Sequence, residues 1–399
     1  YMNPHRQTWG FADDFPFSMI VAITTLVAFF FSAQKKDMIW SRETAVWALF
    51  VGWMFLTTFF SFYPDHAWVQ WEKVWKIQLM SLLVMLIIRE RRHLDIMIWV
   101  IAISIGYYGF KGGIFTLVHG GQYRVQGPAG TFFGGNNEMA LVLIMSIPLM
   151  RYLHLQEPRA WVRHGLAAVM LMTGVAAIGS QSRGALLAIV AMGAFLWLKS
   201  RNKLTTGLLI AVAATIIAMV MPQEWYERIE SIKTYELDAS ALGRINAWHT
   251  AVNVALTHPT GGGFEMFKPQ TFAQYAPEPQ RVHDAHSVYF ELMGEHGFVG
   301  LALFLLLAGL TWWRGNQIIR ACARDPGKKW AADLAAMIQV SLIGFAAGGA
   351  FLGMAYFDLP YQLMVVLLLT ARFNGLLEPR ARDDWRRAAL HRAGPPGQT

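Results

Sequence analysis

The chain has 399 residues, of which 55% are hydrophobic and only 15% are charged, and its mean hydropathy is +0.34. Because soluble proteins carry about 25% charged residues, this composition excludes an ordinary soluble globule. The formal net charge of +8 is expected to come from basic loops that orient membrane helices, so no nucleic acid partner is expected. The single cysteine, Cys322, excludes a disulfide framework and a cysteine-based metal site.

Apolar runs follow one another along the chain. A transmembrane helix needs about 20 apolar residues to cross about 30 Å of hydrocarbon. The runs predict an all-α polytopic membrane protein with about eleven transmembrane helices. They lie near 16–33, 44–62, 72–88, 94–109, 138–153, 164–179, 184–198, 204–221, 288–313, 331–355 and 361–376. Since the chain begins at Tyr1 rather than at Met, a preceding helix is expected, which makes twelve in the full protein.

Basic residues gather on alternate connections between these runs. Because basic loops remain on the cytoplasmic side, this pattern predicts a multi-pass protein of the bacterial inner membrane. The connection at 222–287 then becomes one large periplasmic loop that carries interfacial helices and the active site. The predicted organisation is transmembrane helices 1–8 over 1–221, this loop, helices 9–11 over 288–376 and a basic cytoplasmic tail at 377–399.

One helix is predicted inside the periplasmic loop. Its apolar stripe at helical spacing consists of Leu242, Ile245, Val252 and Leu256 together with His249. The His-Pro pair at 258–259 is expected to end the helix, and the glycines at 261–263 permit a sharp turn. Such a helix would lie on the membrane surface. Arg244 would then point near the lipid headgroups, the alternative being one more solvated base.

Arg183 lies in the only polar interruption between two apolar runs, the sequence Ser-Gln-Ser-Arg-Gly at 180–184. Burying a guanidinium at the outer membrane face is costly without a partner. No acid lies within this hairpin, so an external anion is the expected partner, and arginine matches phosphate oxygens well. The alternative is an arginine that extends to lipid headgroups.

Two histidines stand where the chain re-enters the membrane. His283 and His286 form an i, i+3 pair with Asp284 between them, a set that resembles metal ligands. A zinc site, however, needs at least three protein ligands, and the neighbouring residues show no recognised metal spacing. A single histidine acting as a general base is the simpler interpretation. Asp284 would either orient His286 or be solvated.

A glycine-rich segment at 127–138 precedes the fifth apolar run. Its backbone amides are candidates for facing a phosphate, and Asn136 and Asn137 are suited to capping the helix that follows. No Gly-Lys-Ser/Thr sequence follows the glycines, so the segment is not a P-loop and ATP is not implied.

The order of features after 182 resembles the O-antigen ligase and polymerase superfamily of polytopic glycan transferases. The ligases of this family carry His, then Asn, Ser or Gln, nine residues, Gly, two residues, and Gly, Thr or Tyr. Here the pattern reads His286, Ser287, nine residues, Gly297, two residues and Gly300. Ser-Arg-Gly at 182–184, Gly-Arg at 243–244 and His-Pro-Thr-Gly-Gly-Gly-Phe at 258–264 also resemble family landmarks.

The resemblance implies an O-antigen ligase that moves a glycan from undecaprenyl diphosphate to a lipid A core sugar in lipopolysaccharide assembly. The opening at 2–11 resembles a subgroup described as exosortase-associated O-glycosylation ligases, so a protein acceptor is an alternative. An O-antigen polymerase differs in the acceptor rather than in chemistry.

The non-enzyme alternative is a bicarbonate or other small-solute transporter. It predicts ionisable residues inside the bilayer, but the apolar runs hold few, chiefly Glu291 and Glu295. These two are also consistent with a short outer helix ahead of a span that starts at 297.

An inverting, metal-independent transfer follows from these residues. His286 is predicted to take the proton of the acceptor hydroxyl as this attacks the anomeric carbon, while Arg183 and Arg244 hold the departing diphosphate. The donor is already activated and two guanidiniums neutralise the developing charge, so no cofactor and no metal are expected. The candidate supporting residues are Ser287, Asp284, Gln181, Ser182 and Asn136.

Overall fold

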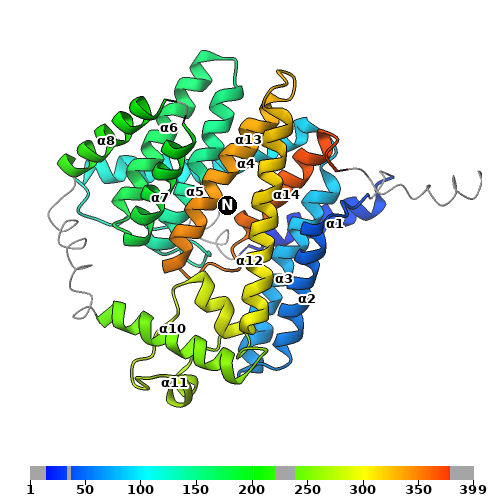
Figure 1. Cartoon of the computed structure of the whole chain (residues 1–399), viewed down its shortest axis with the longest axis vertical. Helices are drawn as coiled ribbons and strands as arrows, with labels where there is room; N and C mark the ends of the chain where they lie inside the picture. The colour runs from blue at the N-terminus through cyan, green and yellow to red at the C-terminus, as the bar shows by residue number, and fades with distance from the viewer. Residues whose placement is uncertain (1–14, 34–36, 201, 221–238, 378–399) are drawn as a thin grey trace, which may run out of the picture.

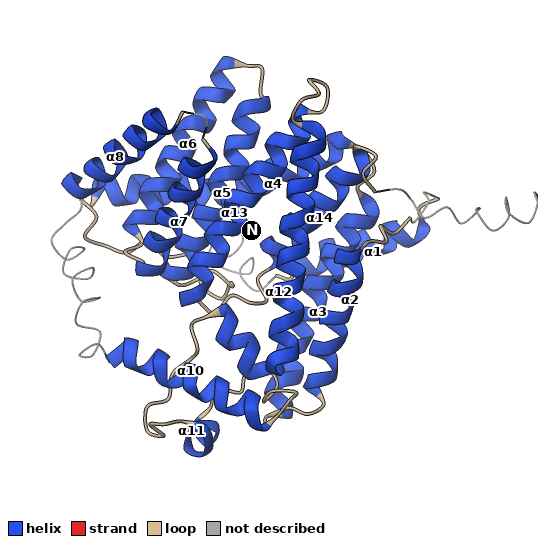
Figure 2. Ribbon diagram, in the orientation of Figure 1, coloured by secondary structure: helices blue, strands red, loops and turns tan. Residues whose placement is uncertain are grey.

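Every predicted apolar run is helical in the computed structural model, which describes residues 15–33, 37–200, 202–220 and 239–377. Figure 2 shows helices and connecting loops throughout this described part, and no strand. The helices are α1 (Phe17–Phe31), α2 (Arg42–Thr58), α3 (Pro64–Ile87), α4 (Arg91–Val118), α5 (Asn136–Gln156), α6 (Ala160–Gly179), α7 (Arg183–Lys199), α8 (Lys203–Val220), α10 (Ala239–Thr257), α11 (Pro269–Tyr275), α12 (Val288–Cys322), α13 (Lys329–Gly348), the short 3-10 helix η3 (Gly349–Phe351) and α14 (Asp358–Phe373).

Five helices in the described ranges are long and apolar enough to cross a membrane, namely α4, α5, α6, α12 and α13 continued by η3. Two shorter apolar helices are α1 and the first part of α8. The chain is therefore a helical membrane protein. The count of eleven spans, the segment boundaries and the periplasmic side of the large loop stay predictions, and the tail from 378 lies outside the described residues.

The basic connections meet at one end of the helix bundle. Arg89, after α3, lies 3.4 Å from the Asp37 carboxylate, and Arg372, near the end of α14, donates to the Asp37 carbonyl at 3.4 Å. Gln156, at the end of α5, donates to Asp333 at the start of α13 at 3.3 Å. Helices α10 and α11 lie at the opposite end (Figure 1). This arrangement agrees with connections that alternate between two sides.

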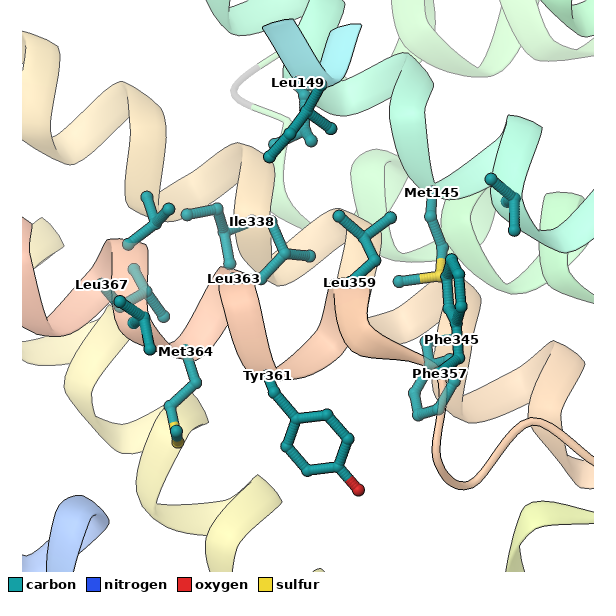
Figure 3. Packing of buried hydrophobic residues seen from close by; sticks show 14 of the residues in the cluster. Met145, Leu149, Ile338, Phe345, Phe357, Leu359, Tyr361, Leu363, Met364 and Leu367 are labelled. Carbon is teal, nitrogen blue, oxygen red and sulfur yellow. The ribbon is translucent and has the colours of Figure 1, made fainter. Parts of the chain in front are cut away.

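The last helix, α14, is enclosed by the rest of the bundle. Leu359 and residues 363–371 are buried, and Figure 3 shows Leu359 and Leu363 in one hydrophobic cluster with Met145 of α5 and Ile338 of α13. Pro360 falls in the first turn of α14, where its missing amide hydrogen costs no helical hydrogen bond. This explains why a short run beside a proline still forms a central helix.

A buried ion pair joins α2 to the second half of α12. The Arg314 guanidinium donates to both carboxylate oxygens of Glu43, at 2.8 and 3.1 Å, and also to Gln317 at 2.5 Å. Both charged side chains are buried. Bidentate geometry compensates part of the cost of removing two charges from water.

Helix α10 packs on α12 through its small residues. Gly243, Ala247 and Ala251 are buried on the packed face. The predicted apolar stripe lies elsewhere, since His249 is exposed and Leu256 is 68% exposed. Close contact between two helices favours small side chains, so the buried face could not be chosen from hydrophobicity alone. Contact of the outward stripe with a membrane surface stays a prediction.

Candidate active site

The predicted base and one predicted arginine come together where α10 crosses the start of α12. The Trp248 ring stacks on Phe290 with centroids 4.8 Å apart, and its indole nitrogen donates to the Ala285 carbonyl at 2.7 Å. Arg244 lies one turn before Trp248 on the same helix, and its charge acts on the pKa of His286. These two residues, 42 positions apart in the sequence, thus lie close enough for the charge of Arg244 to act on His286.

His286 adopts a backbone conformation that is uncommon for its residue type. Its φ is +41°, in the left-handed region, directly before the N-cap residue Ser287 of α12. Such a conformation costs about 1–3 kcal/mol in a residue with a side chain, and it persists only where the surroundings enforce it. The strain marks His286 as a position where the direction of the side chain matters.

The His286 side chain is half-buried, and its pKa is lowered below the usual value of 6.5. Burial is the largest cause, followed by the positive charge of Arg244 and by His283, while Asp284 opposes them. Both main causes disfavour the protonated imidazolium. A larger fraction of His286 is therefore neutral near pH 7, which is the form that can accept a proton.

His283 lies beside His286, with ring centroids 5.1 Å apart. One of its ring nitrogens, Nδ1, pairs with the Asp284 carbonyl at 2.8 Å. Its ring also covers Gly243, where a Cβ would come within 2.8 Å of the imidazole. The absence of a side chain at Gly243 thus permits α10 to approach the 283–286 segment and brings the adjacent Arg244 close to His286.

Arg183 is the first residue of α7, and the preceding Ser182 caps that helix. The Ser182 hydroxyl accepts from the Ala185 amide at 3.2 Å. Asn136 donates from its side-chain amide to the Ser180 carbonyl at 2.9 Å. The prediction that Asn136 caps its own helix is wrong, because Gly135 is the N-cap of α5 and Asn136 holds the turn before α7 instead.

Gln181 supports the same turn from the other side. It has a φ of +56°, and its side-chain amide donates to the Gly121 carbonyl at 2.9 Å. Gln181 and Ser182 are both buried, whereas Arg183 is exposed. These two supporting residues therefore fix the backbone that presents Arg183 at this end of the bundle.

An aromatic contact links the turn at Arg183 to α10. A Cβ at Gly184 would lie 3.6 Å from the Cβ of Phe351, whose ring centroid is 6.2 Å from that of Trp248. Trp248 in turn contacts the carbonyl just before His286. The turn after Arg183 and the connection before His286 thus both contact one group of rings formed by α10, α12 and η3. A joint contact of both arginines with one diphosphate stays a prediction.

Ser287 and Asp284 differ in their surroundings. Ser287 is 1% exposed, it makes no side-chain capping bond to α12, and its hydroxyl has no hydrogen-bond partner among the described residues. Asp284 is exposed, and its charge is the smallest of the influences on the pKa of His286. Ser287 is therefore enclosed by the fold, whereas Asp284 is in contact with solvent.

The described residues contain no group of three or more His, Cys, Asp or Glu side chains that could hold a metal ion. In the glycine-rich segment, the amides of Gly127 and Gly134 donate to carbonyls of the same turn at 3.0 and 3.2 Å. These two amides are consequently occupied and do not face a phosphate. Independence from metal stays a prediction.

Gly297 of the sequence motif bends α12 and lets another segment approach it closely. Helix α12 consists of two segments that meet at Gly297, which has φ +67° and ψ −174°, and the connection after α10 docks there. A Cβ at Gly297 would lie 2.1 Å from the Pro259 carbonyl oxygen. Gly262 and Gly263 donate to the carbonyls of Gly294 and Glu295 at 2.8 and 2.9 Å. The predicted separation of 288–296 from the following helix is confirmed.

A buried polar network next to Gly297 was not recognised in the sequence. Tyr356 contacts the Glu295 carboxylate and lies 2.8 Å from Nε2 of His296. The other ring nitrogen of His296 lies 2.7 Å from the Thr57 hydroxyl. The participating residues come from α2, α12 and the connection before α14, so no local pattern indicates that they meet.

Two parts of the chain match known protein families. Residues 167–305 match the family described as O-antigen ligase. This match supports membership of the O-antigen ligase superfamily through the part of the chain that it covers. Arg183, Arg244 and His286 all lie within the O-antigen ligase match, whereas Asn136 lies before it.

Residues 1–157 match a family of unknown function. No curated protein matches the chain. The resemblance of residues 2–11 to O-glycosylation ligases falls outside the described residues and stays a prediction.

Proposed function

We propose that this protein is an O-antigen ligase, an inverting and metal-independent glycosyltransferase. It transfers a glycan from undecaprenyl diphosphate to a sugar hydroxyl of the lipid A core on the periplasmic side of the inner membrane. The observation that carries the proposal is the pair formed by the half-buried His286 and Arg244 within the O-antigen ligase match. A neutral base beside a fixed cation suits a reaction that deprotonates an alcohol and releases an anion.

A cavity lined in part by Tyr289 supports a lipid-linked donor. It has a volume of about 210 Å³ and lies between α12, α13 and α14. Tyr289, three residues after His286, lines it together with Phe304, Thr311 and Met364. Because α12 bends at Gly297, residues before and after the bend face the same space. The lining is mostly apolar, which suits the first isoprene units of a polyprenyl chain whose diphosphate lies at His286.

The proposed transfer forms one glycosidic bond and breaks the bond between the sugar and the diphosphate. A ring nitrogen of neutral His286 accepts the proton of the acceptor hydroxyl, and the oxygen forms a bond to the anomeric carbon. The bond between that carbon and the diphosphate oxygen breaks, and the electron pair leaves with undecaprenyl diphosphate. Arg183 and Arg244 stabilise the increased negative charge on the leaving group. Attack opposite the leaving group inverts the anomeric configuration.

A reconstituted transfer assay tests the proposal. Purified protein, undecaprenyl-diphosphate glycan and lipid A core are combined in the presence of a chelator, and His286→Ala is compared with wild type. Loss of the base is expected to reduce the rate by about 10²- to 10⁴-fold while donor binding is retained. His283→Ala is the matched control, since it removes the neighbouring imidazole on the same connection, and it should retain most of the activity.

The outcomes separate the alternatives. An active His286→Ala protein contradicts the role of His286 as base. Transfer that stops in chelator and returns with a divalent cation contradicts metal independence. Product formed only with a protein acceptor, or only as a lengthened lipid-linked glycan, assigns an O-glycosylation ligase or a polymerase instead. Solute flux through proteoliposomes without transfer would favour the transporter.

A further inference from the structure

Helix α10 is attached to α12 at two places. At its middle, Trp248 contacts Phe290 and the Ala285 carbonyl. After its end, the connection at 258–265 lies against the bend of α12, where Gly262 and Gly263 donate to backbone carbonyls of the first α12 segment. The connection at 258–265 is distant from His286 along the chain. It is nevertheless bound to the short helical segment 288–296, which begins two residues after His286. The position of α10 along this segment depends on both attachments.

The Glu295 carboxylate is the centre of the second attachment. One of its oxygens accepts from the Glu265 amide at 2.7 Å, and the other accepts from the Tyr356 hydroxyl. Tyr356 precedes α14, so one carboxylate joins the connection after α10 to the connection before α14. Glu295 is 5% exposed. A buried carboxylate without these donors would be strongly unfavourable, so the contacts stabilise this arrangement.

The hydrogen bonds behind Glu295 form a series. The Tyr356 hydroxyl donates to Glu295, and its oxygen lies 2.8 Å from Nε2 of His296. Nδ1 of His296 lies 2.7 Å from the Thr57 hydroxyl, which donates to the Met54 carbonyl at 3.0 Å. Every polar side-chain atom of this series then has a partner. Trp53 adds a bond from its indole nitrogen to the His296 carbonyl at 2.8 Å. The network thereby fixes the first α12 segment against α2 and leaves Glu295 with one preferred orientation.

From these contacts we infer that Glu295 is a positioning residue for donor binding. By tying the 258–265 connection to α12, it sets the register of α10 and so holds Arg244 beside His286. Glu295 acts through Arg244, and it contacts neither reacting group in the structure. The inference rests on the proposed function for the part that concerns the donor, whereas the register itself is a geometric statement that needs no activity.

An engineered cysteine pair measures the register directly. In a Cys322→Ala background, Gly243→Cys and His283→Cys place two cysteines where a Cβ at 243 lies 3.2 Å from the Cβ of residue 283, close to disulfide geometry. Oxidation should cross-link this pair efficiently. Adding Glu295→Gln replaces one of the two acceptor oxygens by an amide NH₂, so one of the two donors loses its acceptor. It should slow cross-linking about tenfold, the loss expected for one misplaced hydrogen-bonding group.

Glu43→Gln is the matched control for lost stability. It also removes a buried carboxylate between α2 and α12, but at the far end of α12 from α10. Cross-linking at 243 and 283 should be unchanged in this variant, even though its melting temperature falls. Tyr356→Phe is a second test variant that keeps the ring and removes one donor, in case Glu295→Gln does not fold.

A double-mutant cycle on donor affinity, measured with undecaprenyl diphosphate, completes the test. Glu295→Gln should weaken binding about as much as Arg244→Ala, by about tenfold, and the two changes together should add little to either alone. With Arg183→Ala the effects should add. Unchanged cross-linking in folded Glu295→Gln and Tyr356→Phe proteins overturns the inference. Slower cross-linking without any donor binding in wild type would instead overturn the proposed function and leave the register role standing.

Discussion

At one end of α12, Arg314 pairs with Glu43 of α2, and at the other end Glu295 accepts hydrogen bonds from two separate connections. The ion pair joins only two helices and lies among the basic loops. The Glu295 network includes α2, α12, the connection after α10 and the connection before α14. An ion pair stabilises the packing of two helices against each other. A branched network also sets the positions of the segments that carry the proposed site.

The largest expected effect on stability is at the ion pair. Glu43→Gln leaves the buried Arg314 charge without a counter-charge, which costs about 3–5 kcal/mol in comparable buried pairs. Thermal unfolding of the protein in detergent measures this loss of stability. Glu72→Gln is the control, because the exposed Glu72–Lys76 pair on α3 should contribute nothing measurable. Weak donor binding by folded Glu43→Gln protein would contradict the claim that only the Glu295 end of α12 affects the proposed site.

A smaller effect is expected at the bend. Gly297→Ala places a side chain at φ +67° and against the Pro259 carbonyl, which should destabilise the protein by about 1–3 kcal/mol. Because the 258–265 connection would be displaced, donor affinity should fall as well. Gly309→Ala in the second segment is the control, since a Cβ there meets nothing within 4 Å and alanine favours a helix. Equal melting temperatures for the two variants would contradict the structural role of Gly297.

The pH dependence of the transfer rate tests the surroundings of His286 in the proposed site. In the proposed mechanism His286 acts in its neutral form, so the rate should rise with pH through the pKa of His286. Burial and Arg244 hold this pKa below 6.5, and the midpoint of the acidic limb should therefore lie below pH 6.5. Arg244→Gln removes one of the two main causes, so the acidic limb should move to higher pH. A pH–rate profile in which the Arg244→Gln limb stayed in place would contradict the closeness of these two residues.

Much of the fold was predictable because apolar runs in a membrane protein have few alternatives to helices. The runs predicted at 94–109 and 288–313 correspond to α4 and α12, which are merely longer. The spacing of His286 and Ser287 to Gly297 and Gly300 also pointed to a segment inside the O-antigen ligase match. It could not separate their tasks, since His286 faces the proposed site while Gly297 bends a helix to admit the Pro259 loop.

The sequence by itself determined the helical class, the gathering of basic connections at one end and the candidates Arg183, Arg244 and His286, since hydropathy, charge and motif spacing are local properties. The tertiary structure alone decided which face of α10 is buried, that Asn136 supports the turn before α7, and that Thr57, Glu295, His296 and Tyr356 form one network. These facts depend on side chains far apart in the chain. Such contacts arise only when packed helices bring buried polar atoms within hydrogen-bonding distance, where each must find a partner.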